Sequence, residues 1–360
     1  VDPGSKVDLA KVDAGFKDKH ESHEHALPEI ESYAQRLHDQ QYLMYAEGKR
    51  SLLICLQGRD AAGKDGTINH VLGAMNPQGC TVTGFKVPSK EEAAHDFLWR
   101  YHQHTPGKGQ VAIFNRSHYE DVLVVRVHDL VPKKVWSQRY EQINAFERML
   151  ADNGTHILKF YLHIDPDEQL ERFKQRILDP ARHWKISDGD YAERPYWDAY
   201  TEAFEDALSK TSTEQAPWFV IPSNHKWFRN LAISRIVAET LESLDMQFPE
   251  PTVDIEAIKK VGEQEVAAVI AGDAEAFLAV FAADFEVMPP NQPAIRGEAA
   301  RQWIADFVGQ ARERAQAQRA DAQLGAYLVA APDDRRAELV GQCVHDLLPV
   351  TDFLAPMVYH

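Results

Sequence analysis

A glycine-bounded loop near the start of the chain contains the residue types that hold phosphate groups. Residues 51–67 have the sequence SLLICLQGRDAAGKDGT, in which the spacing G-x-x-x-x-G-K runs from Gly58 to Lys64. Glycines let such a loop approach phosphate oxygens closely, and its N–H groups and the N-terminus of the following helix attract an anion. Lys64 can reach the outer phosphates. The pattern indicates a P-loop, against the alternative of a glycine-rich turn with a surface lysine.

The metal-binding position of this loop differs from the usual pattern. A serine or threonine normally follows the lysine and binds Mg²⁺, but Asp65 stands here. We expect Asp60, inside the loop, to hold the metal ion instead, because a carboxylate is a hard oxygen ligand. Asp121 is a candidate second metal ligand, with a solvated carboxylate on a helix as the alternative.

Basic residues further along the chain could neutralise phosphate charge. Arg116 follows the apolar segment VAIF, and its guanidinium can fork onto phosphate oxygens; a surface salt bridge is the alternative. The segment from Glu171 to Arg194 could close as a lid over a polyanion and exclude water, or it could be a mixed-charge surface helix. The basic residues of this segment are Arg172, Lys174, Arg176, Arg182, Lys185 and Arg194.

Composition limits the class of protein. The chain has 360 residues and a formal net charge of −16, which argues against nucleic-acid binding and requires a locally basic channel for any polyanionic substrate. Three widely spaced cysteines indicate a reducing compartment, the cytoplasm, without a disulfide framework or a zinc site. We expect no membrane segment, because no run of 18 apolar residues occurs. Candidate walls of the basic channel are Lys86, Lys90, Arg100, Lys108 and Arg126.

Short apolar segments alternate with segments of helical periodicity between residues 21 and 244. This alternation predicts an α/β fold, with a parallel sheet and helices on both faces. Ligands bind such sheets at the carboxyl ends of the strands, where the P-loop and residues 115–116 fall. We expect strands at 52–56, 79–85, 111–114, 156–164 and 218–221, and the main helices at 21–48, 64–75, 91–104, 133–152, 167–178, 196–208 and 227–244.

The composition also suggests four parts along the chain. The polar residues 1–20 are expected to form a flexible N-terminal arm, and residues 21–248 the α/β domain. A proline-containing linker, 249–254, then leads to a small C-terminal extension of α or α+β type, residues 255–360.

Five sequence blocks resemble the polyphosphate kinase 2 family, in order and over about residues 20–247. They are GRDAAGKDGTI, FKVPSKEEAAHDFLWRYHQHTPGKG, IFNRSHYEDVLVVRVH, RILDPARHWKISDGDYAERPYWDAYTEAFEDAL and APWFVIPSNHKWFRNLAIS. The resemblance implies a P-loop kinase-like three-layer sandwich with a helical lid. It also implies reversible, Mg²⁺- or Mn²⁺-dependent transfer of the terminal phosphoryl group of inorganic polyphosphate to AMP or ADP, with adenine or guanine nucleotides as partners and a homodimer or homotetramer as the assembly.

The same resemblance implies roles for individual residues. Asp60 and Lys64 match the Walker A aspartate and lysine, and Asn115 and Arg116 match the Walker B pair, which is Asp-Arg in many members. The FNRSHYED form resembles a class III-like subgroup and places Glu120 and Asp121, with Asn115, near the nucleotide and metal. The implied catalytic residues are Asp60, Lys64, Arg116 and the lid residue Arg176, and the implied phosphate-binding residues are Gly58, Arg59, Ala61, Ala62, Gly63, Asp65, Gly66, Lys86 and Arg182.

The C-terminal third resembles a different family. Residues 255–308 are similar to the start of the SnoaL-like cone-shaped α+β barrel, but residues 309–347 are rich in alanine, arginine and glutamine where the later strands should follow. We therefore expect an incomplete or divergent module without a catalytic assignment.

Two other functions are compatible with the residues. An ATP-dependent P-loop kinase of small metabolites would transfer phosphate without polyphosphate. A non-catalytic polyphosphate-binding module would retain binding without turnover, and Asp65 and Asn115 are the features that keep this alternative open.

Overall fold

The computed structural model describes residues 1–256, 258–260, 286–287 and 295–296. The chain divides into two compact units, Val1–Pro249 and Glu250–His360. In the second unit, β6 (Glu286–Val287) pairs antiparallel with β7 (Ile295–Arg296). The SnoaL-like resemblance falls mostly outside the described residues and stays a prediction.

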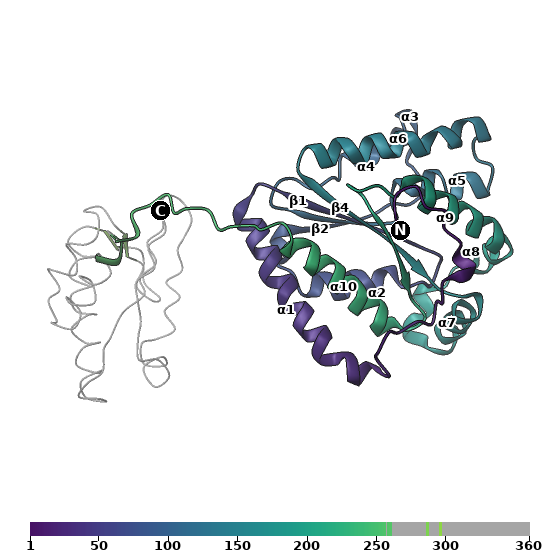
Figure 1. Cartoon of the computed structure of the whole chain (residues 1–360), viewed down its shortest axis with the longest axis horizontal. Helices are drawn as coiled ribbons and strands as arrows, with labels where there is room; N and C mark the ends of the chain where they lie inside the picture. Colours follow the sequence, from purple (N-terminus) through teal and green to yellow (C-terminus); the bar gives the residue numbers. More distant parts are fainter. Residues whose placement is uncertain (257, 261–285, 288–294, 297–360) are drawn as a thin grey trace. The chain divides into compact units, whose positions relative to one another are not determined.

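A five-stranded, all-parallel sheet forms the centre of the first unit (Figure 1). The strand order is β2-β3-β1-β4-β5, so β1 and β4 are central and the P-loop strand is covered by a neighbour on each side. The predicted parallel α/β fold is confirmed. The strands are β1 (Ser51–Gly58), β2 (Cys80–Gly84), β3 (Val111–Asn115), β4 (Thr155–His163) and β5 (Trp218–Pro222).

Helices cover both faces of this sheet because β1 is apolar on both sides. Leu52 and Ile54 pack in the cluster formed with α1 (His23–Glu47), α2 (Lys64–Gly73) and α10 (Lys226–Glu242). The alternate residues Leu53 and Cys55 pack instead with Phe146 of α6 (Lys133–Asp152). Figure 1 shows α1, α2 and α10 on one side of the sheet, and α6 and α9 (Trp197–Thr211) on the other.

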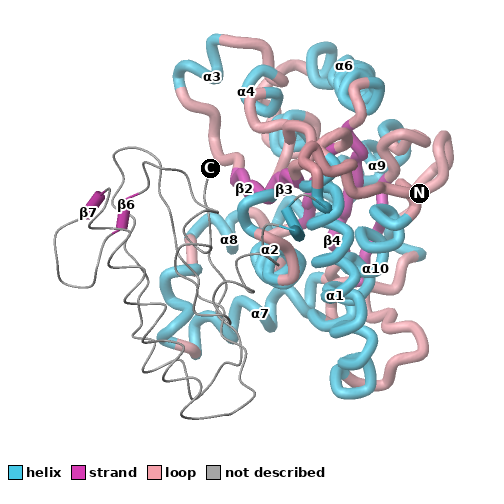
Figure 2. The backbone as a smooth tube through the Cα atoms, turned by 90° about the vertical axis from the view of Figure 1, so that its left-hand side faces the viewer, coloured by secondary structure: helices cyan, strands magenta, loops and turns pink. Residues whose placement is uncertain are grey.

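Shorter elements complete the first unit. In Figure 2, α7 and α8 lie beside each other, away from α3 and α4. The segment that we call the lid runs from α7 to η5, residues 166–196. The shorter elements of the whole first unit are η1 (Leu9–Lys11), η2 (Pro77–Gly79), α3 (Lys90–Ala94), α4 (Trp99–His102), η3 (His118–Asp121), α5 (Val124–Val127), α7 (Pro166–Leu178), η4 (Pro180–Lys185), α8 (Asp188–Ala192) and η5 (Arg194–Tyr196). None of the described helices is long and apolar enough to cross a membrane.

The helix expected at 91–104 is divided into α3 and α4. A capping box forms at its start between Ser89 and Glu92. The helix stops at His95, whose backbone is extended (φ −102°, ψ 176°). The side chain of Asp96 then accepts hydrogen bonds from the N–H groups of Leu98 and Trp99 and begins a new turn.

Residues 1–20, for which a flexible arm is expected, pack against the α/β domain in the structure, with Leu9, Ala14 and His20 each buried. Leu9 is only 2% exposed and belongs to the cluster that contains Phe204 and Leu208 of α9. The N–H of Leu9 donates to Glu205 Oε1 at 2.8 Å, and the N–H of Val7 to Ser209 Oγ at 2.9 Å. The polar composition does not reveal this docking, because it depends on a few apolar side chains, Val1, Val7 and Leu9, and on backbone hydrogen bonds to α9 and β5.

Candidate active site

The P-loop connects the carboxyl end of β1 to the first turn of α2. Its backbone enters the left-handed region at Ala61 (φ 63°) and Gly63 (φ 106°). Arg172 Nη1 donates to the carbonyl oxygens of Ala61 at 2.7 Å and Ala62 at 3.1 Å, and Arg229 Nη1 donates to Ala62 O at 3.2 Å. The loop carbonyls are therefore tied to buried cations, as expected of a loop that presents N–H groups to an anion.

Sequence reasoning missed this supporting role of Arg172 and Arg229. Both side chains are buried, and burial, with Arg172 as the second cause, lowers the pKa of Arg229 to about 10. The sequence places Arg172 in the candidate lid segment and position 229 within the helix expected at 227–244. The one local sign that a side chain packs closely against the loop is Gly63. In the structure, a Cβ at this position would lie 1.8 Å from Arg229 Nη1.

We expect Gly63→Ala to lower kcat/KM by about 10²-fold, since a misplaced loop costs about this much. The alanine would be strained at φ 106° and would collide with a guanidinium held by Ala62 O and Asn230 Oδ1. Steady-state kinetics and thermal unfolding measure the effect. Gly73→Ala, in α2 with open space around its Cβ position, is the matched control and should leave activity unchanged. Equal activity in the two variants would contradict the assigned role of the loop backbone.

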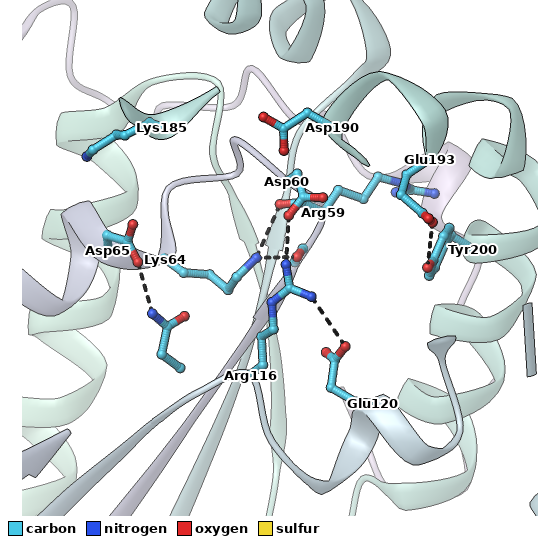
Figure 3. Close-up of polar contacts among 12 residues, drawn as sticks. Arg59, Asp60, Lys64, Asp65, Arg116, Glu120, Lys185, Asp190, Glu193 and Tyr200 are labelled. Carbon is cyan, nitrogen blue, oxygen red and sulfur yellow. Dashed lines mark hydrogen bonds and ion pairs between the residues drawn. The ribbon is translucent and has the colours of Figure 1, made fainter. Parts of the chain in front are cut away.

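Asp60, Lys64 and Arg116 come together at the carboxyl ends of β1 and β3 (Figure 3). Arg116 Nη2 donates to Asp60 Oδ1 at 2.9 Å, and Lys64 Nζ donates to Gly58 O at 2.6 Å. Burial, together with the charge of Arg116, lowers the pKa of Lys64. Arg116 itself has φ 63°, which turns the chain sharply as it leaves β3. A buried ammonium and a half-exposed guanidinium thus face one loop.

Two further residues of the predicted nucleotide site lie next to this group. Glu120 Oε2 is 3.6 Å from Arg116 Nη1, and burial raises the pKa of Glu120 against the opposing charges of Arg116 and Lys64. Asn115 Nδ2 donates to Asp65 Oδ1 at 2.9 Å, which joins the end of β3 to the first turn of α2.

Asp121, in contrast, points away from the site. Its carboxylate accepts from Tyr101 Oη at 2.9 Å and from Arg139 Nη1 at 3.0 Å. Its side chain is only 14% exposed, and both of its oxygens have partners. The structure therefore does not support Asp121 as a metal ligand or a nucleotide ligand. It anchors the turn to α4 and α6, because those partners reach it from distant parts of the sequence.

Three predicted phosphate ligands also differ from expectation. The Arg59 guanidinium stacks 3.9 Å from the centre of the Trp197 ring and donates to Tyr161 Oη at 2.8 Å, so only its backbone remains for phosphate. Arg182 pairs with Asp179 at 2.8 Å on an exposed turn. Lys86 is exposed, and its carbonyl accepts from Arg100. Within the described part of the chain, neither of these two side chains forms a hydrogen bond or ion pair with the P-loop.

The lid brings a carboxylate with an arginine partner toward the P-loop. Arg176 Nη1 donates to Asp190 Oδ2 at 3.0 Å, and Figure 3 shows Asp190 facing Asp60. Burial and the nearby charge of Asp60 raise the pKa of Asp190. Lys185 extends from the lid on the side of Asp65 (Figure 3). The lid therefore presents to Asp60 a carboxylate that Asp60 repels, and Arg176 is the partner of that carboxylate.

An open pocket lies between the P-loop, the lid and α9. Its empty volume is about 520 Å³, including its mouth. One part is polar and adjoins the P-loop, and the other is apolar and aromatic. Its charged lining residues are Arg59, Asp60, Arg116, Glu120, Glu193 and Arg194, and its apolar and aromatic ones are Leu123, Val124, Trp197, Tyr200 and Phe204.

A parallel sheet with a P-loop, a converging lysine and arginine, and a lid that carries arginines and lysines defines a P-loop phosphotransferase. Comparison with known proteins narrows this class. Residues 19–249 match the family model described as Polyphosphate kinase 2 (PPK2), and the chain belongs to this family. The resemblance of the five sequence blocks is thereby confirmed, and the protein is a kinase.

Relatives and solved structures agree with this assignment. The chain is 50% identical over 259 residues to an AMP/ADP-polyphosphate phosphotransferase of Meiothermus ruber, covering 72% of this chain and 97% of that protein. It is 46% identical to an ADP-polyphosphate phosphotransferase of Rhodopseudomonas palustris, covering 70% and 91%. A crystal structure of polyphosphate kinase 2 from Arthrobacter aurescens TC1 superimposes with a TM-score of 0.70 at 41% identity, covering 72% of this chain and 93% of that one.

Proposed function

We propose that the protein transfers the terminal phosphoryl group of inorganic polyphosphate to AMP and ADP, reversibly. The main support for the proposal is the convergence of Lys64, Asp60 and Arg116 at the P-loop, where Asp60 and Arg116 also line the pocket. The relatives named for AMP and ADP support it, because this chain covers nearly their whole length. The family resemblance also suggests a homodimer or homotetramer, which light scattering would determine.

The two substrates are proposed to enter from different sides. The nucleotide base would rest against the apolar part of the pocket, at Trp197 and Phe204, with its phosphates toward Arg116. Polyphosphate would lie under the lid, where Arg176 and Lys185 supply positive charge. This arrangement gives an acidic protein the locally basic channel that a polyanion requires.

The proposed transfer is an in-line displacement. A nonbridging oxygen of the nucleotide phosphate attacks the terminal phosphorus of polyphosphate, and the P–O bond to the rest of the chain breaks, with the electron pair leaving on the shortened chain. No general base is required, because the attacking oxygen is already ionised. Lys64, the loop N–H groups and Arg116 neutralise the charge on the transferring group and align the two chains.

A divalent cation, Mg²⁺ or Mn²⁺, fits at Asp60. Within the described residues, no group of three or more His, Cys, Asp and Glu side chains is placed to hold a metal ion. Magnesium in kinases is commonly held by one or two carboxylates together with phosphates and water, so a single carboxylate in the pocket suits it. The 29% exposed side chain of Asp60 is therefore proposed to bind the cation, which would neutralise phosphate charge.

Asp60→Asn is expected to lower kcat by about 10²-fold and to raise the Mg²⁺ concentration needed for half-maximal activity, because the amide is a poor ligand for a hard cation. Titration of activity with Mg²⁺ measures both. Asp121→Asn is the matched control: it should lower the unfolding free energy by about 1–3 kcal/mol through its Arg139 and Tyr101 bonds, with an unchanged Mg²⁺ requirement. A shifted requirement in Asp121→Asn and not in Asp60→Asn would reverse the assignment.

The function itself is tested with purified protein, polyphosphate, Mg²⁺ and either AMP or ADP, followed by separation of the nucleotides. We expect new ADP from AMP and new ATP from ADP. Phosphate transfer from ATP in the absence of polyphosphate would favour a small-metabolite kinase instead. Binding of polyphosphate with no new nucleotide under any of these conditions would favour a non-catalytic module.

A further inference from the structure

A cluster of buried polar side chains lies directly behind the turn that carries Arg116 and Glu120. Lys159, on β4, and Glu147, on α6, have side-chain exposures of 0% and 1%. Lys159 Nζ donates to Glu147 Oε2 at 2.6 Å, to Tyr119 Oη at 2.8 Å and to Thr211 O at 2.6 Å. A buried ion pair is weak evidence for stability, because apolar residues often replace such pairs without loss. Another role is therefore expected for it.

The cluster fixes three consecutive residues of the turn. Glu147 Oε1 accepts from Tyr119 Oη at 2.8 Å and from His118 Nε2 at 3.0 Å. Ser117 Oγ accepts from Gln57 Nε2 at 3.1 Å, so the turn is also joined to β1. All three turn residues are completely buried. Arg116 before them and Glu120 after them line the pocket, so the inward anchors determine where these two outward side chains lie.

The same ammonium also holds the opposite wall of the pocket. Thr211 is the last residue of α9, and Trp197 and Phe204 of that helix form part of the apolar wall. Lys159 therefore makes direct bonds to the turn, to α6 and to α9 from one position on a central strand. Lys159, Glu147 and Tyr119 do not line the pocket, so they cannot act on a substrate there directly.

We propose that Lys159 and Glu147 are positioning residues, which set the separation between the 117–121 turn and α9 and thereby place Arg116 and Glu120 for phosphoryl transfer. This inference rests on the proposed function, because the groups that it places are those of the proposed transfer. Burial raises the pKa of Glu147, but the Lys159 charge and the His118 bond outweigh it and hold the pKa below its ordinary value. The carboxylate is therefore an ionised acceptor for all three donors.

The test uses two variants and a matched control. Tyr119→Phe keeps the ring but removes the hydroxyl that joins Lys159 to Glu147, and Lys159→Met removes the ammonium. The control, Thr155→Val, lies on the same strand and loses a buried hydrogen bond of 3.0 Å to Ser51 at the end remote from the pocket. All are assayed in the full chain, well below their unfolding temperatures.

We expect kcat to fall about tenfold or more in Lys159→Met and about threefold to tenfold in Tyr119→Phe, because misplaced groups lose rate steeply. KM values should stay within about twofold, since neither variant removes a side chain that lines the pocket. Thr155→Val should keep its kcat. Amide hydrogen exchange of residues 117–123 should become about tenfold faster in Tyr119→Phe, with residues 59–66 unchanged.

Unchanged kcat and unchanged exchange in Tyr119→Phe would overturn the inference, even where Lys159→Met does not fold. An equal loss of kcat in Thr155→Val would also overturn it, because loss of any buried hydrogen bond would then suffice. The exchange measurement is independent of activity. An inactive wild-type protein with the expected exchange pattern would contradict the proposed function and leave the anchoring of the turn supported.

Discussion

Replacement of Lys64 by alanine is expected to lower kcat by about 10²–10³-fold, the range found when one preorganised cationic or N–H donor is removed from a developing oxyanion. Lys64 is 9% exposed and donates to Gly58 O in the structure, so its ammonium already lies inside the loop. Burial lowers the pKa of Lys64 and so disfavours its charged ammonium form. A nearby anion favours that form again, and a phosphate chain is such an anion. Initial rates with polyphosphate and ADP measure the loss.

The control for this variant is an exposed lysine outside the candidate site. Lys133→Ala, at the exposed first residue of α6, should leave kcat unchanged. Thermal unfolding of Lys64→Ala is needed in parallel, because the alanine also leaves the Gly58 carbonyl without its donor. A folded Lys64→Ala protein with wild-type turnover would refute the assigned role of the P-loop.

Arg116→Ala is expected to be more severe, with kcat lower by about 10³-fold, since a guanidinium that stabilises a transferring phosphoryl group is worth 10³–10⁵ in rate. That factor corresponds to about 4 kcal/mol of transition-state stabilisation. Arg116 is placed for this role by its bonds to Asp60 at 2.9 Å and by its approach to Glu120 at 3.6 Å. Arg116→Lys should recover only part of the rate, because an ammonium cannot make the forked contact.

Backbone strain provides the control for Arg116. Its φ of 63° is unfavourable for a residue with a side chain, so Arg116→Gly should lose activity like Arg116→Ala but be the more stable of the two. Unfolding by urea measures the stability of the two variants separately from their loss of activity. Full activity in Arg116→Gly would show that the turn, and not the guanidinium, matters for the reaction.

Features that depend on residues close together in the sequence were predictable. The P-loop follows from seven consecutive positions and the apolar strand before them, and α6 from its 3.6-residue periodicity. The parallel sheet follows from the alternation of apolar strands with helices, and the order of the five blocks identifies the family. Both glycines of the loop, Lys64 and Asp60 lie within this local pattern, so their convergence was expected.

Only the tertiary structure decided which of the other charged residues are available to a substrate. Asp60 and Asp121 are both carboxylates in suitable motifs, yet Asp121 is held by Tyr101 and Arg139 from other elements, whereas Asp60 faces the pocket. Arg59 turns into the α9 layer, whereas Arg172 and Arg229 come from distant helices to the back of the loop. The physical reason is that the free energy of a buried charge depends on partners brought to it by folding, and sequence spacing does not record those partners.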